Sequence, residues 1–248
     1  MEASFDGRFH LGADWEIRAT EQNLMWQKEQ MLNQMIQRLP LEIDRVAWID
    51  ADLLFQNSAW ALETLARLEA VPVVQLFENC RYLNAQGTEI LTHPSFARRL
   101  RDGLDNYGVP GGAWAARRNF LERHGLYASN IIGGGDQVFA HALCGLWHQY
   151  VDQLSPPALQ EDYHRWQVGI WHEVRGQLGC VSGDVYHLYH GTRENRRYVE
   201  RRQILIDARF DPATDLSTDE NGLLQWASDK PDLHQQVRDY FSSRNEDF

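Results

Sequence analysis

The feature that most constrains the fold is the stretch Val46–Phe55, an apolar run interrupted by two carboxylates, Asp50 and Asp52. Its β-branched and aromatic members predict a buried strand. Two acids at the end of such a strand cost desolvation free energy unless a cation or water meets them. Because ligands of open α/β sheets bind at the carboxyl ends of the strands, this pair predicts a site for a divalent cation that carries a phosphate. The alternative is that the two acids only cap the following turn.

The segments around this strand predict an α/β fold. Helices are expected over 23–39 and 57–70, and a second strand is expected over 71–77. Strand, helix and strand at this spacing are typical of a parallel pair. We therefore predict an open, mostly parallel twisted sheet flanked by helices, with a surface loop over 78–93.

The second half of the chain is expected to be mainly helical, with one further strand over 181–190. Helices are expected over the ranges 94–104, 119–124, 137–146, 158–175, 195–206 and 232–243. We predict one domain over 1–206 and an extension of strand and helix, 207–248, packed on it.

Composition limits the classes of function. The 248 residues are 43% hydrophobic and 24% charged, as in soluble globular proteins. A net charge of -11 argues against a general nucleic-acid or anionic-membrane surface, so an anionic substrate would need a metal or a local arginine cluster. No apolar run reaches the about 18 residues of a membrane span, and no signal peptide opens the chain, which predicts a cytoplasmic protein without a membrane partner.

The cysteines and aromatic residues add two expectations. Cys80, Cys144 and Cys180 are odd in number and far apart, which predicts buried thiols rather than a disulfide framework or a zinc site. Nine tryptophans and nine tyrosines are many for this length. Most are expected in the core, and some are candidates to line a sugar-binding site.

Two later motifs carry candidate chemistry. Three glycines, 133–135, precede Asp136 and allow a ligand to approach the main chain closely. Asp136 is then either a general base beside an open pocket or the N-cap of the next helix. His187 and His190 are three residues apart, so they point to opposite faces of the strand, one as a ligand and the other packed, unless the strand bends. Aspartate with imidazole suits Mn²⁺ or Mg²⁺, with Mn²⁺ favoured.

Arginines follow the histidines. Arg193 is a candidate to compensate the charge of a diphosphate. Arg196, Arg197, Arg201 and Arg202 follow, either with the same role or as a solvated basic helix face, and the solvated face is favoured for Arg201 and Arg202.

Taken together, four segments resemble GT-A fold glycosyltransferases, in the galactosyltransferase-like group that includes the chondroitin-polymerase-like enzymes. They are 48–52, 111–114, 133–136 and 187–191, and the resemblance extends from about residue 5 to about residue 205. It implies a metal-dependent enzyme that moves a hexose from a UDP-sugar to a hydroxyl of a carbohydrate or another acceptor. The implied cofactor is Mn²⁺ or Mg²⁺.

The resemblance also implies residue roles. Asp52 would bind the metal directly, together with His190 by preference and His187 as the alternative. Asp136 would deprotonate the acceptor hydroxyl on the face opposite the leaving group, which predicts a single displacement with inversion. The residues implied to bind the donor or its sugar are Asp50, Gly111, Gly112, Trp114, Gly134, Gly135 and Arg193.

The chain departs from this family in two ways. The opening strand and turn that hold the nucleoside are not recognisable, so the sheet is expected to lack its first nucleotide-binding strand, and the exposed edge would favour oligomers. A single acid, Asp136, follows the glycines where relatives often carry two. The alternatives are a non-catalytic sugar- or nucleotide-binding module, a glycosyltransferase that acts on hydroxylated bases of phage DNA through the basic segment 193–202, and a metal-dependent phosphohydrolase.

Overall fold

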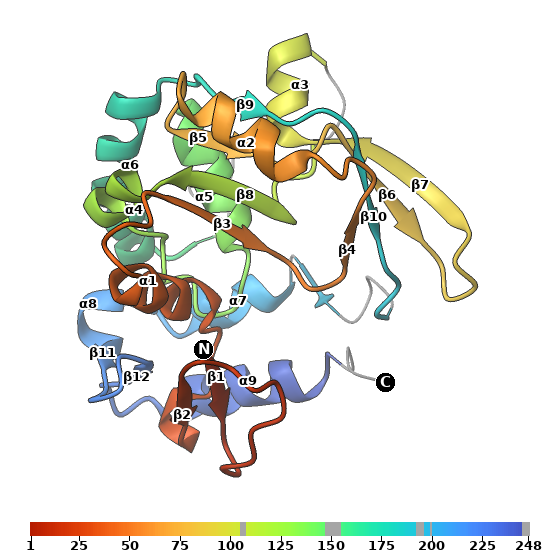
Figure 1. Ribbon diagram of the computed structural model, residues 1–248. Coiled ribbons are helices and arrows are strands. Elements are labelled where there is room, and N and C mark those ends of the chain that lie inside the picture. The colour runs from red at the N-terminus through yellow and green to blue at the C-terminus, as the bar shows by residue number, and fades with distance from the viewer. Residues whose placement is uncertain (105–107, 147–154, 192–195, 199, 245–248) are drawn as a thin grey trace.

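A computed structural model describes residues 1–104, 108–146, 155–191, 196–198 and 200–244. Within these ranges the chain has a mixed α/β fold with two four-stranded sheets, which confirms the predicted α/β class (Figure 1). No helix in this described part combines the length and the hydropathy of a membrane-spanning segment.

The bounds of the elements are as follows. The strands are β1 Glu2–Ser4, β2 Glu16–Arg18, β3 Arg45–Ile49, β4 Leu53–Phe55, β5 Val73–Gln75, β6 Asn79–Leu83, β7 Glu89–Pro94, β8 Ala113–Arg117, β9 Gly179–Cys180, β10 Asp184–His187, β11 Leu216–Thr218 and β12 Leu224–Trp226. The helices are η1 Glu21–Asn23, α1 Lys28–Arg38, α2 Trp60–Leu68, α3 Phe96–Asp102, α4 Arg118–His124, α5 Gly135–Cys144, α6 Pro157–Val174, α7 Glu200–Asp207, α8 Pro212–Asp215 and α9 Pro231–Ser242.

The first sheet has the order β3-β8-β5-β9 and is mixed. Strand β8 is antiparallel to both β3 and β5, and only β5 and β9 pair in parallel. The prediction of a mostly parallel sheet is therefore wrong here. Strands β3 and β5 do run in the same direction, but β8 lies between them. Its small residues fit this central position, because alternate side chains of β8 are buried in the apolar clusters on the two faces of the sheet.

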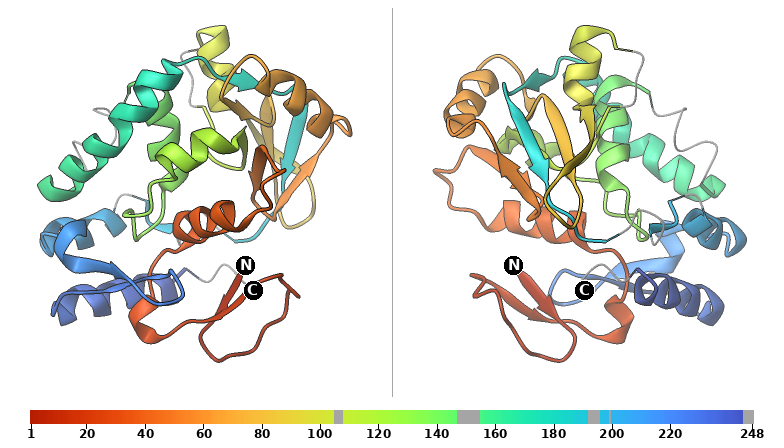
Figure 2. Two further views of the ribbon diagram at one scale, coloured as in Figure 1. Left: turned by 60° about the vertical axis from the view of Figure 1, so that its left-hand side comes forward. Right: turned by 90° about the vertical axis from the view of Figure 1, so that its right-hand side faces the viewer.

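Helices cover this sheet on both faces (Figure 2). Helix α2 packs on one face, where Leu68 joins Val74 and Ala115 in one apolar cluster. On the other face, Phe139 of α5 packs edge-on against Trp48 of β3 and Trp114 of β8, with ring centroids 5.6 and 5.5 Å apart. The sheet is thus buried between two layers, as expected for an α/β domain.

The second sheet has the order β4-β10-β6-β7. Strands β6 and β7 form an antiparallel hairpin, so the surface loop predicted for 78–93 is wrong. The turn is closed by Asn84, whose side chain accepts hydrogen bonds from the backbone N–H groups of Gln86 and Thr88, at 3.0 and 2.9 Å. Strand-forming residues flank this turn, but the polar residues among them hide the alternation of apolar and polar residues that is typical of a strand.

The single strand predicted over 46–55 is divided between the two sheets. Strand β3 ends at Ile49 and β4 begins at Leu53, so Asp50 and Asp52 lie in the turn between the sheets. The N–H of Asp50 donates to the carbonyl of Gly112, at 2.8 Å, in the segment that leads into β8. On the other side, the N–H of Leu188, just after β10, donates to the carbonyl of Asp52, also at 2.8 Å. This turn is therefore held by both sheets.

The remaining predictions hold in outline. Helices expected over 137–146 and 158–175 are α5 and α6. The strand expected over 181–190 is shorter, since β10 ends at His187. The helix expected over 195–206 is α7, which begins at Glu200.

The ends of the chain form a separate layer below the sheets (Figure 1). Strands β1 and β2 pair in parallel, and β11 and β12 form a hairpin. The side chains of Asn23 and Gln27 both donate to the carbonyl of Leu224, at 3.0 and 2.8 Å. Val237 of α9 belongs to the same apolar cluster as Trp114. The division at 206/207 remains a prediction, although the core is continuous across it.

We expect Phe210→Ala to lower the free energy of unfolding by about 3–5 kcal/mol, because a large side chain is removed from a filled core. Phe210 is fully buried in the main apolar cluster. Denaturant unfolding followed by tryptophan fluorescence measures the change. Phe5→Ala is the control, since Phe5 is 50% exposed and should change stability by less than about 0.5 kcal/mol. A separate early transition, with the rest of the protein unaffected, would contradict a continuous core.

Candidate functional site

Three side chains of metal-ligand type converge beside the β3–β4 turn. The Nε2 atom of His190 lies 3.0 Å from Oδ2 of Asp52, and Nε2 of His187 lies 3.6 Å from the same oxygen. One ligand atom from each residue lies within 4.8 Å of the others. Because β10 ends at His187, the chain bends before His190, and both imidazoles face Asp52. The strand thus bends, which is the case in which both histidines can face one carboxylate.

These three residues fit a divalent cation. The Oδ1 atom of Asp52 is buried and has no hydrogen-bond partner among the described residues, which is costly for a carboxylate unless a cation meets it. The Nδ1 atom of His187 lies 3.0 Å from the carbonyl of Leu188, and a proton on Nδ1 leaves the Nε2 lone pair toward Asp52. Burial lowers the pKa of His187, although Asp52 raises it, and the net lowering favours the neutral form that binds metals.

An arginine lies against the same cluster. Nη2 of Arg196 is 2.8 Å from Nε2 of His190 and 3.2 Å from its Nδ1. A guanidinium only donates, so a cation that takes Nε2 of His190 would displace Arg196 from it. Sequence reasoning treated Arg196 only as part of a basic run.

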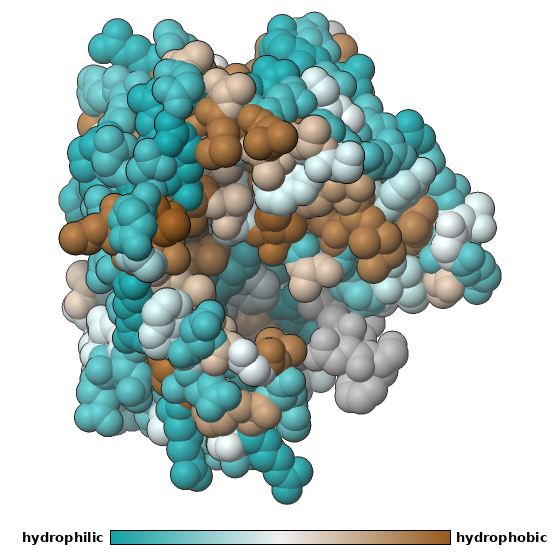
Figure 3. Space-filling model, in the orientation of Figure 1, coloured by the Kyte–Doolittle hydropathy of each residue, from teal (hydrophilic) through white to brown (hydrophobic). Residues whose placement is uncertain are grey.

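The turn borders a hollow in the face shown in Figure 3, between the layer of β3 and β4 and the layer of β1 and α9. The other acid of the turn, Asp50, faces a different partner. Lys28 of α1 lies between two carboxylates, with Nζ 2.7 Å from Oδ1 of Asp50 and 3.1 Å from Oδ2 of Asp136. Burial lowers the pKa of Lys28, but Asp136 and Asp50 raise it by more, so the side chain is a cation. Asp50 thus binds an ammonium group of the protein itself, whereas the resemblance implied a contact with the donor.

Asp136 has the features of a general base. It lies in the first turn of α5, and burial raises its pKa, Lys28 lowers it and Asp50 raises it again. The net effect is a raised pKa, and general bases are most effective when the pKa approaches the working pH. Asp136 lies tightly against Gly111, because a Cβ there would lie 3.1 Å from its Oδ2 and the carboxylate would have to shift slightly.

A third acid, Glu29, lies under the glycines. It is 5% exposed, and Oε2 accepts a hydrogen bond from Nε1 of Trp26 at 2.7 Å. A Cβ on Gly135 would lie 2.1 Å from its Oε1, so only glycine fits there. Burial and then Asp136 raise the pKa of Glu29 to about 7. The sequence contained one signal for this buried acid. Glu29 precedes Ile36 by seven residues, a spacing that places both side chains on the same, inner face of α1.

The remaining predicted donor residues have varied outcomes. Gly112 is half-buried and has φ of +98°, and a Cβ there would lie 3.2 Å from the side chain of Leu53. Gly134 caps α5 with φ of +97°. The expected sugar contact of Trp114 is wrong, because Trp114 is fully buried in the middle strand and its Nε1 donates to the carbonyl of Pro110 at 2.8 Å. Arg193 lies outside the described residues.

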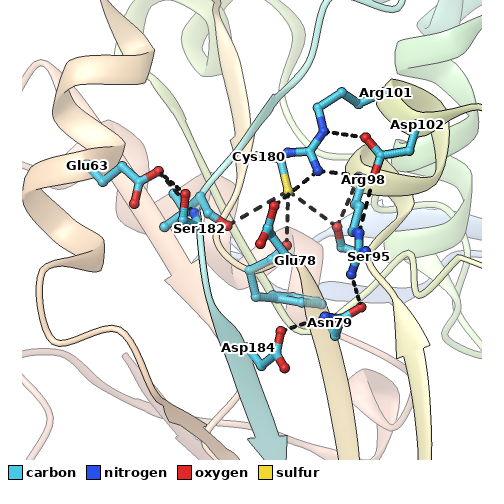
Figure 4. Close-up of polar contacts among 12 residues, drawn as sticks. Glu63, Glu78, Asn79, Ser95, Arg98, Arg101, Asp102, Cys180, Ser182 and Asp184 are labelled. Atoms are coloured by element: carbon cyan, nitrogen blue, oxygen red, sulfur yellow. Dashed lines mark hydrogen bonds and ion pairs between the residues drawn. The ribbon is translucent and has the colours of Figure 1, made fainter.

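A second polar cluster lies near the start of β10 (Figure 4). The side chain of Asp184 accepts from Nδ2 of Asn79 and Nε of Arg81, both at 2.6 Å. Nη1 of Arg98 in turn donates to Oδ1 of Asn79 at 2.5 Å. Burial raises the pKa of the Cys180 thiol, which donates to the carbonyl of Phe77. These partners satisfy one another, so the cluster stabilises the sheet and is not a second candidate site.

A comparison with family models, with curated proteins and with solved structures finds no match for this chain. The candidate site is therefore defined by its own geometry: a cluster of Asp52, His187 and His190 on one side of a turn, and a bridge from Asp50 through Lys28 to Asp136 on the other.

We expect Asp52→Ala and His190→Ala each to weaken Mn²⁺ binding more than about tenfold, because each removes one ligand atom from the cluster. Isothermal titration calorimetry with MnCl₂ measures the affinity. His10→Ala is the matched control, since His10 is exposed and remote from the cluster. Unchanged affinity in both site variants would exclude the assignment.

We expect Glu29→Gln to abolish a loss of stability between about pH 4.5 and pH 7. An acid with a raised pKa in the folded state keeps a proton that the unfolded chain releases, so stability falls as pH rises through this window. A pKa near 7 against an ordinary 4.5 corresponds to about 3 kcal/mol. Urea unfolding at pH 5 and pH 8 tests this. The free energy of unfolding of the variant should rise relative to that of the wild type at pH 8 and not at pH 5. An equal pH dependence in both proteins would contradict the shift.

Proposed function

We propose that this protein is a metal-dependent, inverting glycosyltransferase that moves a hexose from a UDP-sugar to a hydroxyl acceptor. The observation that carries the proposal is that the two acids of one turn serve different groups. Asp52 lies with two histidines in a cluster that suits a divalent cation, and Asp50 is joined by Lys28 to Asp136. The turn of residues 50–52 thus has the proposed cation and diphosphate site beside Asp52 and the candidate base, Asp136, beside Asp50.

The leaving group needs positive charge. As the bond from the anomeric carbon to the diphosphate breaks, negative charge develops on the phosphate oxygens, and a divalent cation held by Asp52, His187 and His190 would stabilise it. Arg196, beside His190, adds a second positive group that can donate to phosphate oxygens. Both matter in a protein of net charge -11, which by itself repels a diphosphate.

Asp136 has the properties that the attacking hydroxyl requires. Its carboxylate takes the hydroxyl proton as the oxygen attacks the anomeric carbon, while the diphosphate leaves from the opposite face. Lys28 holds the carboxylate in place and compensates part of its charge. One base and one displacement give inversion of the anomeric centre. Asp50, paired with the same ammonium, is a positioning residue in this scheme.

We expect Asp136→Asn to lower the rate of transfer by about 10²–10⁴-fold and to leave the affinity for UDP and Mn²⁺ unchanged, because only the proton acceptor is lost. Release of UDP from a panel of UDP-sugars, with Mn²⁺ and a mixture of saccharide acceptors, measures the rate. Calorimetry measures the binding of UDP with Mn²⁺.

Asp52→Ala should instead abolish metal-dependent donor binding, and Asp44→Asn, at an exposed acid, should change neither quantity. A collapse of donor affinity in Asp136→Asn would show that Asp136 is not the base. No UDP release from any donor by the wild type would favour a non-catalytic sugar- or nucleotide-binding module.

A further inference from the structure

Two arginines are buried in the described part of the chain, and they differ in their partners. Arg118 is 7% exposed and pairs with Glu122 at 2.8 Å. Arg201 is 6% exposed, and its guanidinium has one hydrogen bond to a described residue, from Nη1 to the hydroxyl of Tyr240 at 2.8 Å. Its Nε is buried and has no hydrogen-bond partner, and no described carboxylate pairs with it. Arg201 is thus a buried cation without a counter-ion in this part of the chain.

Aromatic rings compensate this charge only in part. Tyr198 and Tyr240 lie over the guanidinium, with ring centroids 5.0 and 5.8 Å away. Cation–π contacts stabilise a desolvated guanidinium, but removing a charge from water costs more than such contacts return. Buried charges are normally paired, so an unpaired one indicates that an anion binds there.

The bonding pattern indicates which edge of the guanidinium has no hydrogen-bond partner among the described residues. Tyr240 takes Nη1, and this leaves the edge formed by Nε and Nη2. The two parallel N–H bonds of that edge match two oxygens of a carboxylate or a phosphate. Tyr198, which lies over the guanidinium, is itself 42% exposed, and its hydroxyl accepts a hydrogen bond from Nη1 of Arg196 at 2.9 Å, so this side chain has to move for a group to reach Arg201.

Arg201 also lies close to the proposed base. Nη1 of Arg201 is 3.5 Å from the position of a Cβ on Gly133, which has φ of +82°. Gly133 precedes Asp136 by three residues, which span at most about 11 Å of chain. The backbone against which Arg201 packs is therefore within about 11 Å of the backbone at Asp136, so a ligand that contacts both side chains has to span on the order of 10 Å.

We infer that Arg201 binds an anionic group of the acceptor, a carboxylate or a phosphate, next to the hydroxyl that Asp136 deprotonates. The acceptor role rests on the proposed function, whereas the anion site itself does not. In a chain of net charge -11, such a group would be repelled from the site unless a dedicated cation received it. Arg201 thereby selects charged acceptors over neutral ones.

The anion site is tested directly by nuclear magnetic resonance. In the ¹⁵N-labelled full chain, the Nε–H signal of Arg201, assigned with Arg201→Lys, should shift and saturate on titration with inorganic phosphate or with acetate at constant ionic strength. The Nε–H signal of Arg118 is the internal control and should not move, since Glu122 already occupies it. Saturation by phosphate at lower concentration indicates a phosphorylated acceptor, and saturation by acetate at lower concentration indicates a carboxylated one.

Two variants extend the test. Arg201→Gln should lose the thermal stabilisation that the anion gives to wild type, and Arg118→Gln should retain it. If Arg201→Gln does not fold, Arg201→Lys is used instead. This variant keeps the positive charge but lacks the two parallel N–H donors, so it should weaken anion binding at least about tenfold. In transfer assays, Arg201→Lys should raise KM for a charged acceptor by a similar factor and leave KM for the donor unchanged.

The outcomes separate this inference from the proposed function. No shift of the Arg201 signal with either anion, or an equal shift of Arg118, overturns the anion site. If Arg201 binds the anions but the protein turns over no donor, the anion site is confirmed and its role in binding an acceptor is excluded. If the protein transfers a sugar to neutral acceptors and the Nε–H signal of Arg201 does not shift with either anion, the anion site is overturned and the proposed function stands.

Discussion

The structure depends on the turn between β3 and β4, where one chain segment passes from the first sheet to the second. Backbone hydrogen bonds fix the turn on both sides, through the carbonyl of Gly112 and the N–H of Leu188. The side chains of Asp50 and Asp52 are therefore directed by two rigid sheets, and a site on such elements is more precise than one on a loop. The same constraint explains how two acids so close in sequence acquire different partners.

Charge balance around this turn is incomplete within the described residues. Lys28 faces three carboxyl groups, those of Asp50, Asp136 and Glu29. Burial first, and a neighbouring carboxylate in addition, raise the pKa of Asp136 and of Glu29. Asp52 keeps an unpaired buried oxygen. Natural proteins tolerate such costs mainly at functional sites, where a ligand completes the balance. The paired cluster around Asp184 is the contrast, because there each charge already has its partner.

The sequence predicted those features that depend on local pattern and residue type. The apolar run of β3 and the helical periodicity of α5 and α6 are of this kind, and the metal-binding role of Asp52 with the histidines stays a prediction. The position of β8 was not predictable, because strand order depends on contacts between distant segments. Lys28 was missed for the same reason, since 108 residues separate it from Asp136. Trp114 was misassigned because its motif was interpreted without the burial that the central strand imposes.

The glycines near the site have a physical role beyond flexible backbone. Gly111 makes room for the carboxylate of Asp136, Gly135 for that of Glu29, and Gly133 lies against Trp26 and Arg201. A side chain at Gly135 would displace a buried acid, and one at Gly111 would press on the proposed base. The space that the glycines leave is thus taken by side chains of the protein itself, among them two carboxyl groups and a guanidinium. It follows that a ligand beside these glycines would be recognised through those side chains more than through exposed backbone. This accounts for the ionisable groups that lie so close to a buried surface.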